Sequence, residues 1–399
     1  MSAPLPSGAA DRPSTVAAGP SSGVRVDRHD LRRADGRRLL IYGELRGDLV
    51  HDGTRPADQA ALHQRHDALT DTWVAISPAR NQRPNSKLAE RDQRAVPACP
   101  LCPGGPEVPF SYDAAVFENR WPTLVADPPP VVDDPRVAPS LGRCEVVLYT
   151  EAHLGSLGDL DGAALARVVA VWRDRSAELW ADPAHRFVLI FENRGEAVGA
   201  TISHPHGQIY AFDRVPPFIA ARARALDAHR VAKGTCLSCD VVLADEAVPD
   251  RQVATGHAFM VAVPFAARWP FEVRIRARRH GLRRLTDLRP TEQVELTTLL
   301  RTVVARYDGL FGFELPYMMV VHEAPDDVPD WHLSVEFMPP HRTAELTKIR
   351  ASVETATGLF INDTLPEQSA ARLAAVTVRS VPEQTEPSIV VPSTTHARG

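Results

Sequence analysis

The chain carries one pattern of cysteines and histidines twice. Each copy begins with a Cys-X-X-Cys pair and continues with two histidines, which lie 51 positions apart in the first copy and 52 in the second. Two such coincidences are improbable by chance, so the sequence predicts one structural unit that has been duplicated. The two sets are Cys99, Cys102, His153 and His204, and Cys236, Cys239, His280 and His332.

Between its two histidines, each copy also carries a helical stretch and then a strand-like run. Residues 167–180 place apolar side chains on one face of a helix, and residues 294–311 repeat that pattern. A short apolar run follows each helix, at 186–191 and at 316–321, as is typical of a buried strand. We therefore expect an α+β fold that mixes helices and strands within each half.

Length and composition divide the chain further. Its 399 residues allow two or three domain-sized units, each large enough to bury a core. We place the two halves at 24–213 and 214–380. The segments 1–23 and 381–399 are rich in Pro, Ser, Thr, Ala and Gly without an apolar period, so we expect two disordered tails.

Charge and hydropathy narrow the functional classes. The net charge of −5 argues against sequence-independent binding to the phosphates of nucleic acids. No apolar stretch reaches the roughly 18 residues that span a bilayer, and the N-terminal segment lacks a basic start and an apolar core. These features predict a cytoplasmic protein that binds neither nucleic acid nor membrane.

The duplicated Cys and His sets predict two metal sites. Two thiolates and two imidazoles satisfy tetrahedral Zn²⁺, and four protein ligands leave no open position, so each zinc would be structural. A Cys-X-X-Cys pair alone also fits a thioredoxin-like dithiol, and two buried thiols acting as small apolar groups are a further alternative. The histidines at matched positions favour zinc.

The element HPHGQ at 204–208 is the strongest local motif. Alternate residues of a strand share a face, so His204, His206 and Gln208 lie together. With His204 on the metal, His206 is a free imidazole that can act as nucleophile or general base, and the Gln208 amide can donate to a phosphoryl oxygen. A pair of histidines that only binds metal is the alternative. Glycines that allow backbone N–H groups to approach a phosphate precede the motif, at Gly195 and Gly199.

FENRGEAVG, followed by HPHGQIYAF, resembles the galactose-1-phosphate uridylyltransferases, a branch of the histidine-triad (HIT) superfamily. The resemblance runs from about Trp73 to Ala374. It implies a duplicated HIT-like half-barrel of antiparallel strands flanked by helices, and a homodimer. It also implies a ping-pong reaction in which His206 takes the uridylyl group from UDP-glucose and galactose 1-phosphate then accepts it, within galactose metabolism.

The resemblance assigns further roles to single residues. Arg80 and Arg83 match the pair that meets the phosphates, and Asn119 matches a uridine contact. A last segment, which reaches the partner subunit's active site in the family, carries ligands for the sugar phosphate and the hexose. The implied substrate-binding residues are Arg80, Arg83, Asn119, Asn193, Gly199, Thr201, Gln208, Lys348 and Glu354.

The chain departs from the family pattern in two places. Ala200 replaces a common cysteine, so that thiol is not essential here. Some members hold iron at a second site through one glutamate and three histidines. Here His322 is retained, but Ser334 and Glu336 stand where two of the histidines would be, so we expect no iron.

Two other functions fit parts of the pattern. An ADP-sugar or dinucleotide phosphorylase, or an adenylyltransferase, would use the same scaffold, nucleophile and zinc. A zinc-stabilised binding or scaffold protein would need only the Cys and His sets. The presence of His206 and Gln208 beside the metal ligands favours an enzyme, and the segment that ends in Glu354 favours a hexose substrate.

Overall fold

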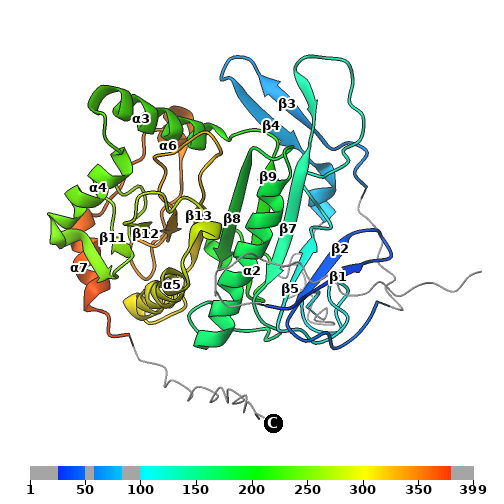
Figure 1. Cartoon of the computed structure of the whole chain (residues 1–399), viewed down its shortest axis with the longest axis horizontal. Helices are drawn as coiled ribbons and strands as arrows, with labels where there is room; N and C mark the ends of the chain where they lie inside the picture. Colours follow the sequence, from blue (N-terminus) through cyan, green and yellow to red (C-terminus); the bar gives the residue numbers. More distant parts are fainter. Residues whose placement is uncertain (1–25, 50–57, 83–98, 379–399) are drawn as a thin grey trace, which may run out of the picture.

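The computed structural model describes residues 26–49, 58–82 and 99–378, so the tails expected at both ends lie outside the described residues. Its largest feature is an eleven-stranded sheet in which neighbouring strands pair antiparallel (Figure 1). The strand order is β1-β2-β5-β7-β9-β8-β13-β14-β12-β11-β10. These strands are β1 Arg28–Arg32, β2 Arg38–Tyr42, β5 Ala114–Glu118, β7 Gly142–Leu148, β8 Phe187–Arg194, β9 His206–Phe212, β10 Gln252–Thr255, β11 Phe259–Ala262, β12 Val273–Ala277, β13 Tyr317–His322 and β14 Ser334–Met338.

The strand order confirms the duplication. From the centre outward it reads β8-β9-β7 on one side and β13-β14-β12 on the other. The two halves join where β8 and β13 pair edge to edge, with Val320 opposite Phe191. One continuous sheet therefore runs through both halves, and the main apolar core contains residues from each of them.

Two long helices cover one face of this sheet. Helix α2 (Gly162–Ala181) and helix α5 (Pro290–Phe311) include the predicted helical stretches and contact each other across the pseudo-symmetric centre. The Asp161 side chain accepts a hydrogen bond from the Ala164 amide and so caps α2, whereas Pro290 begins α5. Their apolar stripes bury side chains such as Trp172 against the sheet, which explains why both halves need this helix.

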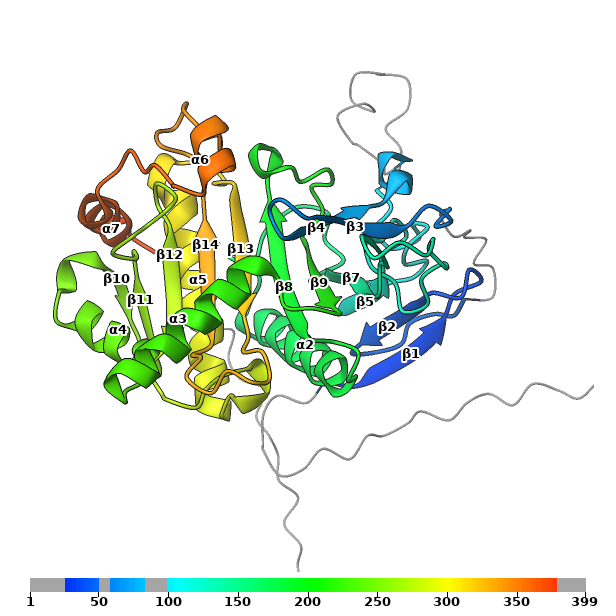
Figure 2. The same cartoon turned by 90° about the horizontal axis from the view of Figure 1, so that it is seen from above.

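Smaller elements complete the described chain. Figure 2 shows α3 and α4 in the second half, and the β3–β4 hairpin beside the first half of the main sheet. None of the helices in the described ranges combines the length and apolarity needed to cross a bilayer. The remaining elements are β3 His63–Asp67, β4 Thr72–Ile76, β6 Val137–Pro139, α3 Pro217–Lys233, α4 Leu237–Glu246, α6 Ser352–Thr357, α7 Pro366–Ala375 and the short 3₁₀ helices Pro78–Gln82, Glu196–Val198, Pro249–Arg251 and Leu285–Asp287.

Strand β9 positions the functional motif. Its residues alternate between half-buried and buried from His206 onward. Ile209 and Ala211 point into the core beneath α2, whereas His206, Gln208 and Tyr210 face the opposite side. The face that is free of α2 and α5 therefore carries the chemistry.

Candidate active site and metal clusters

A cavity of about 490 Å³ opens on the face of β9 that carries His206. It brings together residues from β4, β5, β7, β8 and β9, from the 3₁₀ helix Pro78–Gln82 and from the connecting loops. This confirms that segments far apart in the sequence meet at one place. The predicted site residues that line the cavity are Arg80, Asn119, Asn193, Gly199, Thr201, His206 and Gln208.

The imidazole of His206 is fixed in one tautomer. Its Nδ1 lies 2.8 Å from the carbonyl oxygen of His204. Because a carbonyl oxygen can only accept, Nδ1 carries the proton and Nε2 keeps its lone pair. Burial lowers the pKa of His206, although the bond to the His204 carbonyl opposes that change. The ring is therefore neutral and oriented at the cavity wall, a state in which an imidazole can act as a nucleophile.

The glycine inside the motif is required by packing. A Cβ at Gly207 would lie 2.1 Å from the hydroxyl oxygen of Tyr149, which is fully buried on the core side of β9. Tyr149 in turn packs edge-on against Trp172 of α2. Because Gly207 has no side chain, β9 can pack directly against the large Tyr149 side chain. This packing positions His206 and Gln208 relative to the core.

Arg80 is anchored at the cavity wall by three partners. Its Nη1 donates to Thr123 Oγ1 at 2.9 Å, and to the Trp121 carbonyl and the Tyr210 hydroxyl at 3.3 Å each. Trp121, Thr123 and Tyr210 also line the cavity. Sequence reasoning missed all three partners. Tyr210 could have been found, because it lies four positions after His206 on the same strand face.

The remaining predicted ligands in the cavity lie on the segments before and beside β9. Asn119 Oδ1 accepts from the Trp121 amide at 2.9 Å, which leaves its amide nitrogen available. Asn193 lies near the end of β8 and lines the cavity. Gly195 and Gly199 flank the 3₁₀ turn before the motif with φ of 85° and 82°, a region that favours glycine.

Two of the predicted ligands among the described residues do not lie in this cavity. Lys348 and Glu354 are buried in the second half, where Lys348 Nζ lies 2.7 Å from Glu354 Oε1. Lys348 also donates to the carbonyls of Arg268 and Ile361, so its three N–H groups have three partners. Arg83 lies outside the described residues.

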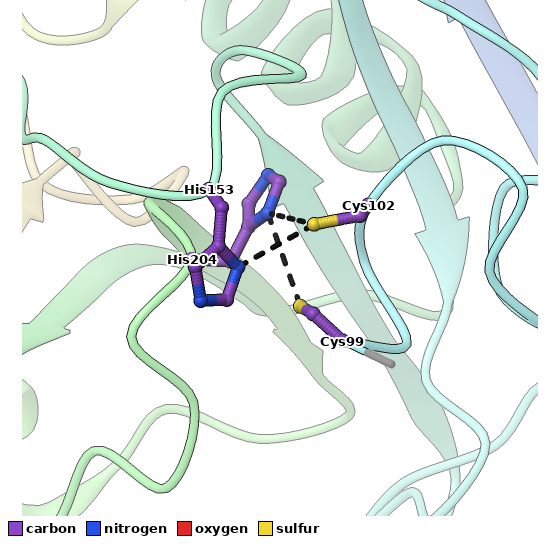
Figure 3. Close-up of side chains that lie close together, drawn as sticks. All are labelled: Cys99, Cys102, His153 and His204. Atoms are coloured by element: carbon purple, nitrogen blue, oxygen red, sulfur yellow. Dashed lines mark hydrogen bonds between the residues drawn. The ribbon is translucent and has the colours of Figure 1, made fainter. Parts of the chain in front are cut away.

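The first Cys and His set forms a compact cluster next to the cavity (Figure 3). Its four ligand atoms lie within 4.8 Å of one another. Cys102 Sγ is 3.4 Å from His153 Nδ1 and 3.5 Å from His204 Nδ1, and Cys99 Sγ is 4.0 Å from His204 Nδ1. Ligands of a tetrahedral metal with S and N bonds of about 2.0–2.3 Å stand about 3.3–3.8 Å apart, so the cluster fits such an ion.

The surroundings of His204 also suit a metal ligand. Its Nε2 donates to the Thr150 carbonyl at 2.9 Å and lies 3.1 Å from the Tyr112 hydroxyl, so Nδ1 is the nitrogen left to bind a metal. Burial lowers the pKa of His204 to about 4, which keeps the ring neutral. Burial and the neighbouring Cys99 raise the pKa of Cys102 to about 11, and a bound cation would favour the thiolate instead.

The second set forms a matching cluster in the other half. Cys239 Sγ lies 3.7 Å from His280 Nδ1 and 3.5 Å from His332 Nε2, and Cys236 Sγ lies 3.7 Å from the same His332 nitrogen. Here the second histidine presents Nε2, because its Nδ1 donates to the Ala277 carbonyl at 2.8 Å. Both clusters can therefore hold a metal, through opposite ring nitrogens of the second histidine.

An oriented neutral imidazole beside amides and a guanidinium is the constellation of a group-transfer enzyme with a histidine nucleophile. Comparison with known proteins makes this class specific. The family described as galactose-1-phosphate uridyl transferase matches residues 53–216 with its N-terminal domain and residues 222–384 with its C-terminal domain.

Relatives and solved structures agree with that family. The chain is 39% identical to the galactose-1-phosphate uridylyltransferase of Thermotoga maritima over 78% of this chain and 98% of the relative. It is 34% identical to that of Streptomyces lividans over 86% and 96%. A solved uridylyltransferase structure matches with a TM-score of 0.71 and 31% identity over 79% and 98%. The chain belongs to the galactose-1-phosphate uridylyltransferase family and is a nucleotidyltransferase.

A solved ADP-glucose phosphorylase from Arabidopsis thaliana shares the fold. It matches with a TM-score of 0.60 over 79% of this chain and 99% of that one. Its identity of 24% shows a common architecture and does not bear on the choice of nucleotide.

Proposed function

We propose that this chain is a UDP-glucose–hexose-1-phosphate uridylyltransferase that works through a uridylyl group on His206. The observation that carries the mechanism is the imidazole of His206, which borders the cavity with its Nδ1 proton held by the His204 carbonyl at 2.8 Å. A neutral imidazole attacks phosphorus without a separate base and later leaves it readily.

The first displacement forms the intermediate. Nε2 of His206 attacks the α-phosphorus of UDP-glucose, the N–P bond forms, and the bond to the bridging oxygen breaks. Glucose 1-phosphate leaves with the electron pair of that bond. The imidazole gains positive charge in this step, and the His204 carbonyl stabilises it through the Nδ1–H bond.

The second displacement reverses the roles. A phosphate oxygen of galactose 1-phosphate attacks the same phosphorus, the N–P bond breaks, and UDP-galactose forms with neutral His206 restored. Glucose 1-phosphate leaves the α-phosphorus in the first step, and galactose 1-phosphate attacks it in the second. Because both are sugar phosphates, a single cavity serves both steps.

The cavity residues position and stabilise the phosphoryl group. Arg80 is held rigidly by Thr123 and Tyr210 and supplies positive charge. The Gln208 amide shares the strand face of His206 and donates to a phosphoryl oxygen, and Asn193, Gly199 and Thr201 line the same cavity. Asn119 binds on the uridine side, beside the apolar side chains of Phe117 and Val146. Arg83, outside the described residues, keeps its phosphate role as a prediction.

Each Cys and His cluster is proposed to hold one structural zinc. Four protein ligands leave no open coordination position, so the ion supplies rigidity and not Lewis acidity. The first zinc fixes His204, whose carbonyl orients His206. We therefore connect the first zinc, and not the second, to the nucleophile.

The proposed assembly is a homodimer. The segment around Lys348 and Glu354 exposes six large apolar side chains, more than scattered surface residues would. Lys348 uses all its donors within the subunit, so it must exchange one of them to bind a sugar phosphate in the partner's cavity. The exposed side chains are Leu346, Ile349, Val353, Leu359, Ile361 and Leu365. The cytoplasmic location expected from the sequence stays a prediction.

The decisive experiment is trapping of the intermediate. The protein is incubated with uridine-labelled UDP-glucose, quenched without acid, and analysed by mass spectrometry for an acid-labile adduct of UMP mass. We expect the adduct on His206, its discharge by galactose 1-phosphate, and the release of UDP-galactose. An His206→Gly protein that still forms the adduct would overturn the assignment of the nucleophile.

A matched control and a second donor complete the design. His63→Gly changes a histidine on β3, outside the cavity, and should form the adduct normally. ADP-glucose with phosphate tests the phosphorylase alternative. Turnover of that pair, with no UDP-galactose from UDP-glucose and galactose 1-phosphate, would replace the proposed function by the alternative.

A further inference from the structure

The second half contains a counterpart of the active-site cavity wall. In the sheet register, Ser334 and Glu336 of β14 take the places of His206 and Gln208 of β9. The residues paired with them also change character. Val146 and Leu148 on β7 lie opposite Gln208 and His206, whereas Arg274 and Arg276 on β12 lie opposite Glu336 and Ser334. Apolar side chains in one half are thus replaced by two guanidinium groups in the other.

The carboxylates on this face are already engaged. Glu336 accepts from Arg274 at 3.0 Å and from His322 Nε2 at 2.9 Å, and it also pairs with Arg268. Glu272 accepts from Arg274 at 2.8 Å. The two carboxylates are therefore shared among Arg268, Arg274 and His322.

One more cation lies over the same face. The guanidinium of Arg222, on α3, lies 3.9 Å from the ring centroid of Trp331. Among the described residues it has no hydrogen bond or ion pair, whereas Arg276 is paired with Asp245 at 2.9 Å. Burial, with Arg274 and Arg276 nearby, lowers the pKa of Arg222 to about 9, so the group remains charged at neutral pH. The Arg222 side chain is partly exposed, and a partly desolvated cation among like charges is stabilised when an anion joins it.

The face remains accessible in part. The side chains of Arg268, Arg274 and His322 keep 31%, 28% and 16% of their surface exposed. Within the described structure, the Nε–H group of each of these two arginines has no hydrogen-bond partner. Donors without partners on a partly exposed face suit a ligand with several acceptor atoms.

We propose that this partly exposed face of β12 and β14, next to Arg222 of α3, binds a phosphate group, with Arg222 as its principal ligand. The surplus positive charge excludes a metal cation. The arginines that replace Val146 and Leu148 leave no apolar wall for a nucleobase. A phosphate offers acceptor oxygens in several directions, which suits the planar forks of Arg222, Arg268 and Arg274.

The test measures binding of ³²P-orthophosphate to the full chain by equilibrium dialysis at low salt. UDP is present at saturation to occupy the cavity of His206. We expect wild type to retain about one bound phosphate per subunit, and Arg222→Gln to raise the dissociation constant at least tenfold. Arg224→Gln, an exposed arginine on the same helix, is the matched control and should bind as wild type does.

Further measurements separate the possible outcomes. Arg222→Lys keeps the charge and should bind with intermediate affinity, which also covers the case that Arg222→Gln fails to fold. Competition by galactose 1-phosphate shows whether a free or a sugar-linked phosphate is preferred. Equal phosphate binding by wild type, Arg222→Gln and Arg222→Lys would overturn the proposal. Uridylyl transfer to His206 in these variants is a separate readout, so the two proposals can fail independently.

Discussion

The two halves of the sheet share a plan, but only the first has a histidine at the position of His206. Both keep a Cys and His cluster, a long helix on the core face and the same central strand order. At the position of His206 the second half has Ser334, which cannot carry a uridylyl group through a neutral nitrogen. The Cys and His cluster is therefore common to both halves, whereas the proposed uridylyl transfer depends on a few side chains on one strand face of the first half.

The packing beneath β9 differs from the packing beneath β14, and the changes in side-chain size compensate for each other. The first half pairs a small Gly207 with a large Tyr149. In the matching register the second half has Val335 on β14 and the small Ala277 at the end of β12. Each half thus places one bulky side chain in the same space, because the core density has to be conserved.

Replacement of His206 should produce the largest difference in turnover between matched variants of the two halves. His206→Gly should lower turnover at least about 10⁴-fold, because the covalent route is lost and only positioning remains. Ser334→Ala, at the matched position, should stay within about threefold of wild type. Steady-state assays of UDP-galactose formation measure both. Comparable losses in the two variants would mean that both halves take part in the chemistry.

A second test concerns Glu192, which lies between the halves. Tyr317 donates to it at 3.1 Å, and burial raises its pKa to about 7 from an ordinary value of 4.5. The folded state then holds the proton more tightly than the unfolded state. Stability from this group is complete below pH 4.5, decreases as the pH rises from 4.5 to 7, and is constant above. The decrease amounts to up to about 3 kcal/mol.

Glu192→Gln should therefore flatten this pH dependence. The second half has Val321 at the matching place, so this half contributes no titrating group at that position. Urea unfolding at pH 5 and pH 8 gives the free energies of unfolding. A variant whose stability changes with pH as wild type does would exclude Glu192 as the titrating group.

A third test separates the two metal clusters. Cys99→Ser and Cys239→Ser should each reduce the zinc content from about two to about one per subunit. Only Cys99→Ser should lower kcat by about 10- to 100-fold, because its cluster holds His204, which orients His206. Metal analysis and assays of the same preparations provide the comparison. Equal losses of kcat would show that the second cluster also supports the nucleophile.

The smallest expected effect concerns the packing exchange. Gly207→Val alone should destabilise, since the new side chain meets the Tyr149 hydroxyl, and Tyr149→Ala alone should leave a cavity. The double variant copies the second half and should be more stable than the sum of the single changes predicts, by about 1.5 kcal/mol. A double-mutant cycle from denaturant unfolding measures this coupling. Strict additivity would contradict the proposed exchange.

Much of the candidate site could be predicted from residues close in sequence. The motif at 204–208 placed His206 and Gln208 on one face, and both line the cavity. The predicted helices at 167–180 and 294–311 lie inside α2 and α5, because an apolar period of 3.6 is a local property. The anchoring of Arg80 by Thr123 and Tyr210 was not foreseen, since those contacts join three separate segments.

Residue spacing alone was enough to predict the duplication, the two Cys and His sets and the shared strand face of His206 and Gln208, because spacing along one strand or helix dictates which side chains share a face. Only the tertiary structure decided how the halves join through β8 and β13, and which ring nitrogen of His204 or His332 faces each cluster. It also placed the Arg222 guanidinium over the ring of Trp331. Such contacts depend on the register between distant strands, which no local pattern specifies.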